Sequence, residues 1–279
     1  MKNTGNSDAL WQDLQRIRAQ APLIHNITNY VVMNITANAL LAVGASPVMA
    51  HALEEVEEMA RLAQAVVINI GTLSPAWVAA MRAAGREAHR RGIPVVLDPV
   101  GSGATRYRTA AARMLIEETH PAIIRGNASE IRSLIRSGPG TKGVDSTHAP
   151  EEIVGDARTL ARACRCVVVV SGAVDLIIAG RAVLRVANGH PLMARVTGMG
   201  CVATALIGAF AAVNPSPFRA AAHAMALMGV AGELAAERSA GPGSFAPAFL
   251  DALHLIRKSD LAQRLCMQSP RGTRRTDSG

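Results

Sequence analysis

Runs of apolar residues recur along this chain, and each run is followed by glycine or polar residues and then by a helical pattern. The clearest runs lie within residues 65–72, 93–100, 122–127 and 166–172. Strands that are apolar at nearly every position are typical of a parallel sheet, because both of their sides are buried. The alternation with helices therefore predicts an α/β fold, with a mostly parallel central sheet covered by helices on both faces.

Helical patterns account for most of the remaining chain. We expect helices over residues 8–20, 30–43, 75–91, 107–119, 128–136, 150–165, 202–213, 217–239 and 245–266, and another that begins in the acidic residues 54–58. A further strand is expected over residues 23–29, a hairpin over 176–186 and a flexible loop over 138–143. Because no repeat or linker divides the chain, we expect one domain over residues 1–267 and a disordered basic tail over 268–279.

Polar and glycine residues follow the expected strands at their carboxyl ends. They are Asn26, Asn29, Gly71, Thr72, Asp98, Asn127, Ser171 and Gly172. Open α/β sheets bind ligands at the edge where these strand ends meet. Asn26 and Asn29 would offer amide groups to a polar ligand there, although Asx turns explain the same two residues.

The stretch 197–201, Thr-Gly-Met-Gly-Cys, precedes a long uncharged helical run. Gly198 and Gly200 let the backbone approach a ligand closely. The helix behind them would direct free N–H groups and a partial positive charge towards a phosphate or a developing oxyanion. The same helix start is expected to lower the pKa of the Cys201 thiol. A glycine-rich turn that only packs a buried helix is the alternative interpretation.

Composition argues against several other classes of protein. The net charge of +8 is carried almost wholly by Arg, and no basic run is interleaved with aromatic residues, so nucleic-acid binding is not indicated. No apolar run reaches the roughly 18 residues of a membrane span, and residues 1–10 lack the apolar core of a signal peptide. The four cysteines are too few for a disulfide scaffold. We expect a cytoplasmic protein that binds neither nucleic acid nor a membrane.

Phosphoryl transfer is the chemistry that fits most of these residues. It needs an anion cradle, oxygen ligands around Mg²⁺ and a group beside the acceptor hydroxyl. Residues 198–201 would form the cradle, and Asn127, Glu130 and Asp98 would hold a hydrated Mg²⁺ at the same sheet edge. Asn127 with Glu130 three residues later is also a common helix N-cap pattern.

Other catalytic and nucleotide-binding motifs are incomplete. The chain has no P-loop, and residues 101–106 lack the third glycine of a dinucleotide-binding fingerprint. A hydrolase that used Cys201 as its nucleophile would need a histidine base. The sequence does not place His25, His190 or His223 beside that thiol.

Several stretches, taken in order, resemble those of one kinase family. They are residues 22–29 (PLIHNITN), 36–38 (TAN), 44–49 (GASPVM), 69–73 (NIGTL), 97–101 (LDPVG), 124–130 (IRGNASE) and 241–245 (GPGSF). The chain from about residue 22 to residue 253 resembles hydroxyethylthiazole kinases, which are thiamine-salvage enzymes of the ribokinase-like superfamily. The resemblance implies a three-layer αβα fold. It also implies ATP- and Mg²⁺-dependent phosphorylation of the primary hydroxyl of 4-methyl-5-(2-hydroxyethyl)thiazole.

The resemblance also implies roles for individual residues. Met49, Gly198 and the segment around Asn26 would bind the thiazole, and Arg125 and Ser171 would contact ATP. Asn127 and Glu130 would serve the metal site, as the residues themselves suggest. Members of this family are trimers with active sites between subunits, so a homotrimer is expected.

Two positions depart from the family pattern. Met199 replaces the Thr of Gly-Thr-Gly-Cys, which weakens ATP binding or leaves the contact to backbone amides. Ser171 stands where Thr is common and keeps the hydroxyl. Cys201 occupies the place of an Asp base in related sugar kinases. Because a loose transition state asks little of a base, we expect Cys201 to contribute less than the backbone of Gly198 and Gly200.

Three alternatives stay open at the level of sequence. One is a ribokinase-like kinase that acts on a pyridoxal- or pyrimidine-type alcohol. The second is a hydrolase that uses Cys201, and the third is a nucleotide-binding relative without catalytic activity.

Overall fold

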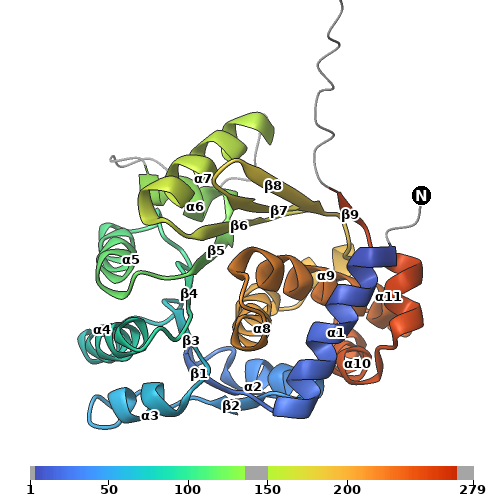
Figure 1. Ribbon diagram of the computed structural model, residues 1–279, viewed down its shortest axis with the longest axis horizontal. Helices are drawn as coiled ribbons and strands as arrows, with labels where there is room; N and C mark the ends of the chain where they lie inside the picture. Colours follow the sequence, from blue (N-terminus) through green and yellow to red (C-terminus); the bar gives the residue numbers. More distant parts are fainter. Residues whose placement is uncertain (1–3, 136–149, 269–279) are drawn as a thin grey trace, which may run out of the picture.

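A nine-stranded sheet separates two layers of helices in the computed structural model, which describes residues 4–135 and 150–268 (Figure 1). The strand order is β2-β1-β3-β4-β5-β6-β7-β8-β9. The strands from β2 to β6 in this order are parallel, and β7, β8 and β9 add to the sheet antiparallel. This topology confirms the expected mostly parallel sheet.

The strands cover nearly the segments that the apolar runs predict. They are β1 (Leu23–Ile27), β2 (Ser46–Val48), β3 (Ala65–Asn69), β4 (Val95–Asp98), β5 (Ile123–Asn127), β6 (Val167–Ser171), β7 (Asp175–Ala179), β8 (Ala182–Val186) and β9 (Met267–Gln268). In β3, Val67 packs into the core on one face, whereas Val66 and Ile68 pack into the core on the other. Successive side chains of a strand point to opposite faces, so a run that is apolar throughout marks a strand covered twice.

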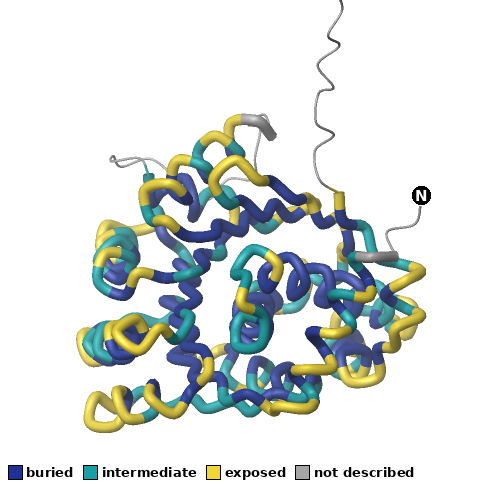
Figure 2. Tube along the Cα trace, in the orientation of Figure 1, coloured by how far each residue is buried: buried dark blue, intermediate teal, exposed yellow. Residues whose placement is uncertain are grey.

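Each face of the sheet has its own layer of helices and its own hydrophobic core. On one face lie α1 (Thr4–Gln20), α2 (Met33–Val43), α8 (Met199–Val213), α9 (Pro217–Ala236), α10 (Pro242–Leu255) and α11 (Lys258–Arg264). On the other lie α3 (Val56–Leu62), α4 (Pro75–Arg90), α5 (Arg106–Thr119), α6 (Ala128–Ile135) and α7 (Pro150–Cys164). Figure 2 shows that the sheet and the inner sides of these helices are buried. The short helix η1 (Pro191–Arg195) leads from β8 to α8.

Caps explain where the helices begin and end. Ser74 accepts a hydrogen bond from the backbone N–H of Trp77 at the start of α4, and Gly44 ends α2 in the left-handed conformation that glycine favours. The single helix expected over residues 245–266 is wrong. Ile256 and Arg257 are extended, and Asp260 accepts a hydrogen bond from the Arg257 N–H, so a new helix begins there.

Three further sequence expectations concern membrane spans, the loop 138–143 and the C-terminal tail. Among residues 4–135 and 150–268, no helix has the length and hydropathy of a membrane span. The expected loop 138–143 and the tail beyond residue 268 lie outside these residues. Gln268, which the sequence assigns to the start of the tail, instead pairs with Arg185 in the sheet.

Candidate active site

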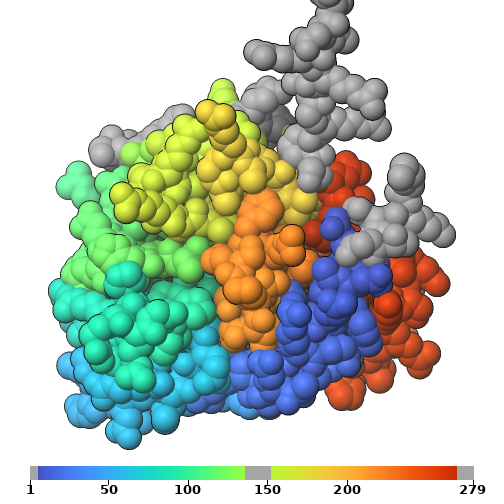
Figure 3. Space-filling model, in the orientation of Figure 1, coloured from blue at the N-terminus to red at the C-terminus, as the bar shows by residue number. Residues whose placement is uncertain are grey.

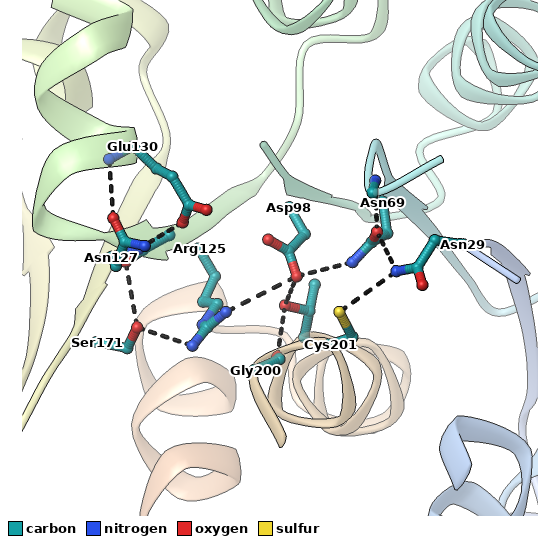
Figure 4. Close-up of polar contacts among 12 residues, drawn as sticks. Asn29, Asn69, Asp98, Arg125, Asn127, Glu130, Ser171, Gly200 and Cys201 are labelled. Atoms are coloured by element: carbon teal, nitrogen blue, oxygen red, sulfur yellow. Dashed lines mark hydrogen bonds and ion pairs between the residues drawn. The ribbon is translucent and has the colours of Figure 1, made fainter. Parts of the chain in front are cut away.

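The carboxyl ends of the parallel strands bring together most of the residues that the sequence suggests for phosphoryl transfer (Figure 4). Asn69 and Asp98 are register partners at the ends of β3 and β4. Asn127 and Ser171 are register partners at the ends of β5 and β6. The first turn of α8 approaches the same edge, where Gly200 lies against Arg125 of β5. The described residues thus form one constellation, although they come from distant parts of the chain.

Gly198 and Gly200 at the start of α8 let neighbouring side chains approach the backbone closely. Gly198 is the N-cap with φ of +87°, and a Cβ built on it would lie 2.9 Å from Cγ1 of Val32. A Cβ on Gly200 would lie 2.7 Å from Nη1 of Arg125. The absence of side chains therefore allows a guanidinium to approach the backbone at the positive end of the helix.

Asp98 lies at the centre of the constellation and has no exposed surface. Its Oδ2 accepts hydrogen bonds from Oγ1 of Thr204 at 2.7 Å and from Nδ2 of Asn69 at 2.9 Å. Nη1 of Arg125 lies 3.8 Å from the same oxygen. Oδ1 is buried without a hydrogen-bond partner among the described residues. Burial raises the pKa of Asp98 to about 6, and the charge of Arg125 opposes this shift.

Arg125 connects Asp98 to the next strand. Its Nη2 donates a hydrogen bond to Oγ of Ser171 at 2.7 Å, and 12% of its side chain is exposed. The guanidinium therefore lies between a buried carboxylate and a strand-end hydroxyl, with the first turn of α8 beside it. A fixed cation in this place can bind the charged end of a nucleotide.

Cys201 is placed as the sequence suggests, but its pKa shifts the other way. Nδ2 of Asn29 lies 3.5 Å from the Cys201 Sγ. Burial raises the pKa of the thiol, and the charge of Asp98 raises it further, whereas the amides of Asn69 and Asn29 and the charge of Arg125 lower it. The expected lowering is wrong, because burial and the charge of the neighbouring carboxylate outweigh the two amides and Arg125.

Asn127 and Glu130 form the N-cap that the sequence offered as their alternative explanation. Oδ1 of Asn127 accepts a hydrogen bond from the Glu130 N–H at 2.9 Å, and Oε2 of Glu130 accepts one from the Asn127 N–H at 2.8 Å. Oε1 of Glu130 also accepts one from the Gly101 N–H at 2.8 Å. This arrangement fixes the carboxylate, but each of its oxygens keeps a lone pair for a further ligand.

Mg²⁺ fits the oxygen donors at this edge. Among the described residues, no group of three or more His, Cys, Asp or Glu side chains could hold a metal by itself. Mg²⁺ sites often use only one or two carboxylates together with water and substrate phosphates. Asp98 with its unpartnered Oδ1 and the fixed Glu130 match that pattern.

The structure shows the position of the side chain of Met199, which is one of the two departures from the family pattern. Its side chain is 6% exposed and packs into the core on the α8 face of the sheet. The residue at this position therefore presents its backbone, and not its side chain, to the edge of the sheet. The buried side chain is not available for a phosphate contact, and a contact through the backbone amides stays a prediction.

The residues expected to bind the thiazole are less closely connected. Met49 follows β2 and is partly buried, and its carbonyl oxygen lies 3.1 Å from Nδ1 of His51. Asn26 has no exposed surface, and its Nδ2 donates to the Ile24 carbonyl. Its Oδ1 is buried without a partner among the described residues. These side-chain and carbonyl contacts of Asn26 and Met49 are local and do not reach the constellation around Asp98.

Sequence reasoning did not select Asn69 or Thr204 as site residues. Asn69 donates to Asp98 and accepts from Nδ2 of Asn29 at 3.0 Å. The sequence could have indicated Asn69, because it is a polar residue at the end of an apolar run, as Asp98 is. Thr204 lies one turn after Gly200 in an otherwise apolar helix, and a hydroxyl in such a helix is more often bonded to its own backbone.

The histidines considered as bases for a thiol hydrolase are bonded elsewhere. Nε2 of His25 donates to the Ala50 carbonyl at 2.7 Å. Nδ1 of His190 accepts from the Leu192 N–H, and Nδ1 of His223 lies 2.7 Å from Oδ2 of Asp13. None of these contacts involves Cys201, so the hydrolase alternative loses its base.

Comparison with known proteins indicates one family. Residues 14–259 match the family described as "HK: Hydroxyethylthiazole kinase family". A hydroxyethylthiazole kinase of Syntrophus aciditrophicus is 59% identical over 256 residues, which are 91% of this chain and 95% of that protein. A solved hydroxyethylthiazole kinase structure from Pyrococcus horikoshii OT3 has 44% identity and a TM-score of 0.87, and the match covers 94% of this chain and 99% of that one.

A more distant structure supports the fold alone. The pyridoxal kinase of Staphylococcus aureus in complex with pyridoxal is 16% identical, with a TM-score of 0.61 over 89% of this chain and 97% of that chain. This likeness confirms the expected ribokinase-like, three-layer αβα fold. The match over residues 14–259 and the identity to curated relatives define the family more closely. The chain belongs to the hydroxyethylthiazole kinase family.

Proposed function

We propose that this kinase transfers the γ-phosphoryl group of ATP to the primary hydroxyl of 4-methyl-5-(2-hydroxyethyl)thiazole. The observation that carries the proposal is the close approach of the Arg125 guanidinium to Gly200, in the first turn of α8. Backbone N–H groups at a helix start and a fixed guanidinium together stabilise the charge of a transferring phosphoryl group. The names of the similar proteins supply the acceptor.

The residues at the carboxyl edge of the sheet have separate roles in this reaction. The backbone of Gly198, Gly200 and Cys201 binds the transferring group, and the two glycines allow its close approach. Arg125 and Ser171 bind the ATP phosphates, which the hydrogen bond between them supports. Cys201 lies beside the acceptor hydroxyl as a neutral thiol, because burial raises its pKa.

Glu130, Asn127 and Asp98 are proposed to hold a hydrated Mg²⁺, the two acidic residues through their carboxylate oxygens and Asn127 through water. When bound, the ion neutralises phosphate charge and orients the transferring group. Support comes from the unpartnered Oδ1 of Asp98 and from the hydrogen bonds that fix Glu130. The amide Oδ1 of Asn127 already accepts from the Glu130 N–H and from Oγ of Ser129, which occupy both of its lone pairs, so Asn127 contributes through a water ligand of the ion.

Met49, Gly198 and Asn26 are proposed to bind the thiazole. A homotrimer with active sites between subunits would complete this part of the site. The exposed side chains of Tyr30 and Val31, 63% and 71% exposed, support a subunit contact here. They directly follow Asn29, whose amide reaches Cys201. We also propose a cytoplasmic location.

A coupled ADP-release assay tests the proposal directly. We expect ADP release with the thiazole alcohol and Mg²⁺, and much less with pyridoxal or hydroxymethylpyrimidine. Preference for one of these two alcohols would instead favour a ribokinase-like kinase of different specificity. ATP binding without ADP release on any alcohol would indicate a non-catalytic relative.

A further inference from the structure

Arg108, in the first turn of α5, makes an unusual set of contacts outside the residues described so far. Its Nη1 donates hydrogen bonds to the carbonyl oxygens of Ile70 at 2.7 Å and Val100 at 2.9 Å. Its Nη2 donates to the carbonyl oxygen of Gly71 at 3.0 Å. One guanidinium thus joins the turn after β3 to the turn after β4.

The position of Arg108 in its helix is electrostatically unfavourable by itself. The backbone N–H of Arg108 donates to Oγ1 of Thr105, the N-cap of α5. A cation in the first turn faces the positive end of the helix dipole, where acidic residues are preferred. The three carbonyl oxygens offset that repulsion. Because Arg108 donates to three loop carbonyls from an unfavourable position in the helix, we infer that its function is to hold the two turns together.

Both joined turns also hold residues of the active site. The Gly71 N–H donates to Oδ1 of Asn69 at 2.9 Å, and a Cβ on Gly71 would lie 2.5 Å from Nδ2 of Asn29. In the other turn, the Gly101 N–H donates to Oε1 of Glu130 at 2.8 Å. A small shift of either turn would therefore move the amides beside Cys201 or release the carboxylate of Glu130.

Gly101, in the turn after β4, lies against the aliphatic part of the Arg108 side chain. Gly101 has φ of +72°, and a Cβ built on it would lie 3.2 Å from Cδ of Arg108. The left-handed turn and the close approach both require glycine at this position. This explains a glycine in the 101–106 segment, which the sequence could not assign to dinucleotide binding.

We propose that Arg108 is a positioning residue for phosphoryl transfer, because it fixes the turns after β3 and β4 on either side of Asp98. The activity part of this inference rests on the proposed function. The guanidinium hydrogen bonds of Arg108 reach the turns after β3 and β4, whereas Arg125 and Ser171 lie on β5 and β6. Loss of the guanidinium should therefore lower kcat, since misplacement of reacting groups by about 1 Å can reduce a rate on the order of 100-fold. The KM for ATP should change much less.

The test compares Arg108→Ala and Arg108→Lys with Arg106→Ala, an exposed arginine of the same helix turn. We expect kcat for the thiazole alcohol to fall about 10- to 100-fold in Arg108→Ala, and Arg106→Ala to behave as wild type. Arg108→Lys should recover only part of the rate, because an ammonium lacks the planar fork. Added methylguanidinium should restore kcat in Arg108→Ala, whereas methylammonium at the same ionic strength should not.

Amide hydrogen exchange provides a reading that needs no substrate. In Arg108→Ala the N–H groups of Gly71 and Gly101 should exchange faster, and methylguanidinium should restore their protection. Unchanged protection of both amides, or a kcat within about twofold of wild type, would overturn the inference. A wild-type protein that releases no ADP with the thiazole alcohol would contradict the proposed function, while hydrogen exchange still decides the role of Arg108.

Discussion

The two halves of the candidate site are held in different ways. The inner half is buried and consists of Asn29, Asn69, Asp98, Cys201 and Thr204; apart from the partly buried Cys201, its residues are at most 6% exposed. Its hydrogen bonds join side chains that are far apart in the chain, such as those of Thr204 and Asp98. The outer half consists of Arg125, Asn127, Glu130 and Ser171 and reaches solvent at Asn127. Most of its bonds are local or cross between paired strands, and one joins Glu130 to the turn after β4.

This difference predicts a division of kinetic effects. A charge in the buried inner half is poorly screened, so it acts strongly on any charge that develops beside it. The outer half can exchange its ligands with solvent, as a site that loads a nucleotide and a metal must. Figure 3 shows that the α8 region, in orange, is flanked by distant parts of the sequence on one face of the molecule. We therefore expect inner substitutions to lower kcat and outer substitutions to raise the KM for ATP.

Asp98→Asn should have the largest effect. The substitution keeps an oxygen for Thr204 and Asn69 but removes the negative charge beside Arg125 and at the proposed metal site. We expect kcat to fall on the order of 100- to 1000-fold, as for the loss of one preorganised electrostatic group. Steady-state kinetics of the thiazole alcohol would measure it. A decrease of less than about tenfold would place the chemistry elsewhere.

The same substitution should stabilise the protein at high pH. The pKa of Asp98 is about 6 in the folded chain, compared with 3.8 for an ordinary aspartate. Between these values the folded state binds a proton that the unfolded state does not, so wild-type stability falls as the pH rises towards 6 and then levels off. At pH 8, Asp98→Asn should gain on the order of 2–3 kcal/mol in unfolding free energy. The gain should shrink as the pH falls from about 6 to about 4.

Asp175→Asn is the matched control for this experiment. Burial also raises the pKa of Asp175 to about 6, and its Oδ1 accepts a hydrogen bond from the Gly172 N–H. The control should therefore show a pH-dependent gain of the same sign, without the large loss of kcat. Equal losses of kcat in the two variants would mean that the effect on kcat is not specific to Asp98.

Arg125→Ala should have the next largest kinetic effect, on the KM for ATP. It removes the guanidinium that contacts Ser171 and Asp98. We expect the KM for ATP to rise about tenfold or more, since a charged hydrogen bond contributes about 1.5–3 kcal/mol. An unchanged KM would contradict the nucleotide contact.

Gly200→Ala should reproduce much of this effect without touching Arg125 itself. The new Cβ would lie 2.7 Å from Nη1, so the guanidinium must move. Because both substitutions act on one contact, their effects on the KM for ATP should be far from additive in the double variant. Additive effects would show that Gly200 acts through the α8 backbone alone.

The sequence predicts the fold well because local rules and long-range packing agree. Ile68 and Val67 lie in a run that is apolar at every position, and only a doubly covered strand buries both. The expected helix over residues 245–266 was wrong because an extended pair, Ile256 and Arg257, interrupts it. Their sequence contains neither Gly nor Pro, and the side chain of Asp260 acts only once the break has formed.

Site residues that end a strand were predictable from the sequence. Residues that reach the site from a helix, such as Thr204 of α8, were not. Asp98 and Ser171 were found in this way, because parallel strands align their carboxyl ends. Thr204 was missed, since its partner lies more than a hundred positions away in the chain. The raised pKa of Cys201 was also not predictable, because the sequence shows the helix start but not the burial.

Cys201→Ser tests the inner half with a smaller change. Burial raises the pKa of the thiol, so it is protonated near neutral pH and does not serve as a thiolate base. A serine hydroxyl can take the amide contact of Asn29. We expect kcat to stay within about tenfold of wild type, with the same dependence on pH from about 7 to about 8.5. Complete loss of activity, with ATP binding and thermal stability intact, would make the thiol essential.

Met199→Thr should have the smallest kinetic effect, although it restores the residue common in the family. The Met199 side chain is buried in the core and does not face the phosphates, so an added hydroxyl has no substrate oxygen to meet. We expect the KM for ATP to change less than about twofold and the unfolding free energy to fall by about 1–3 kcal/mol. Met225→Thr, at a second core methionine in α9, should show the same loss of stability. A clear decrease in the KM for ATP in Met199→Thr alone would mean that the first turn of α8 rotates when ATP binds, and that its side chains join the outer half.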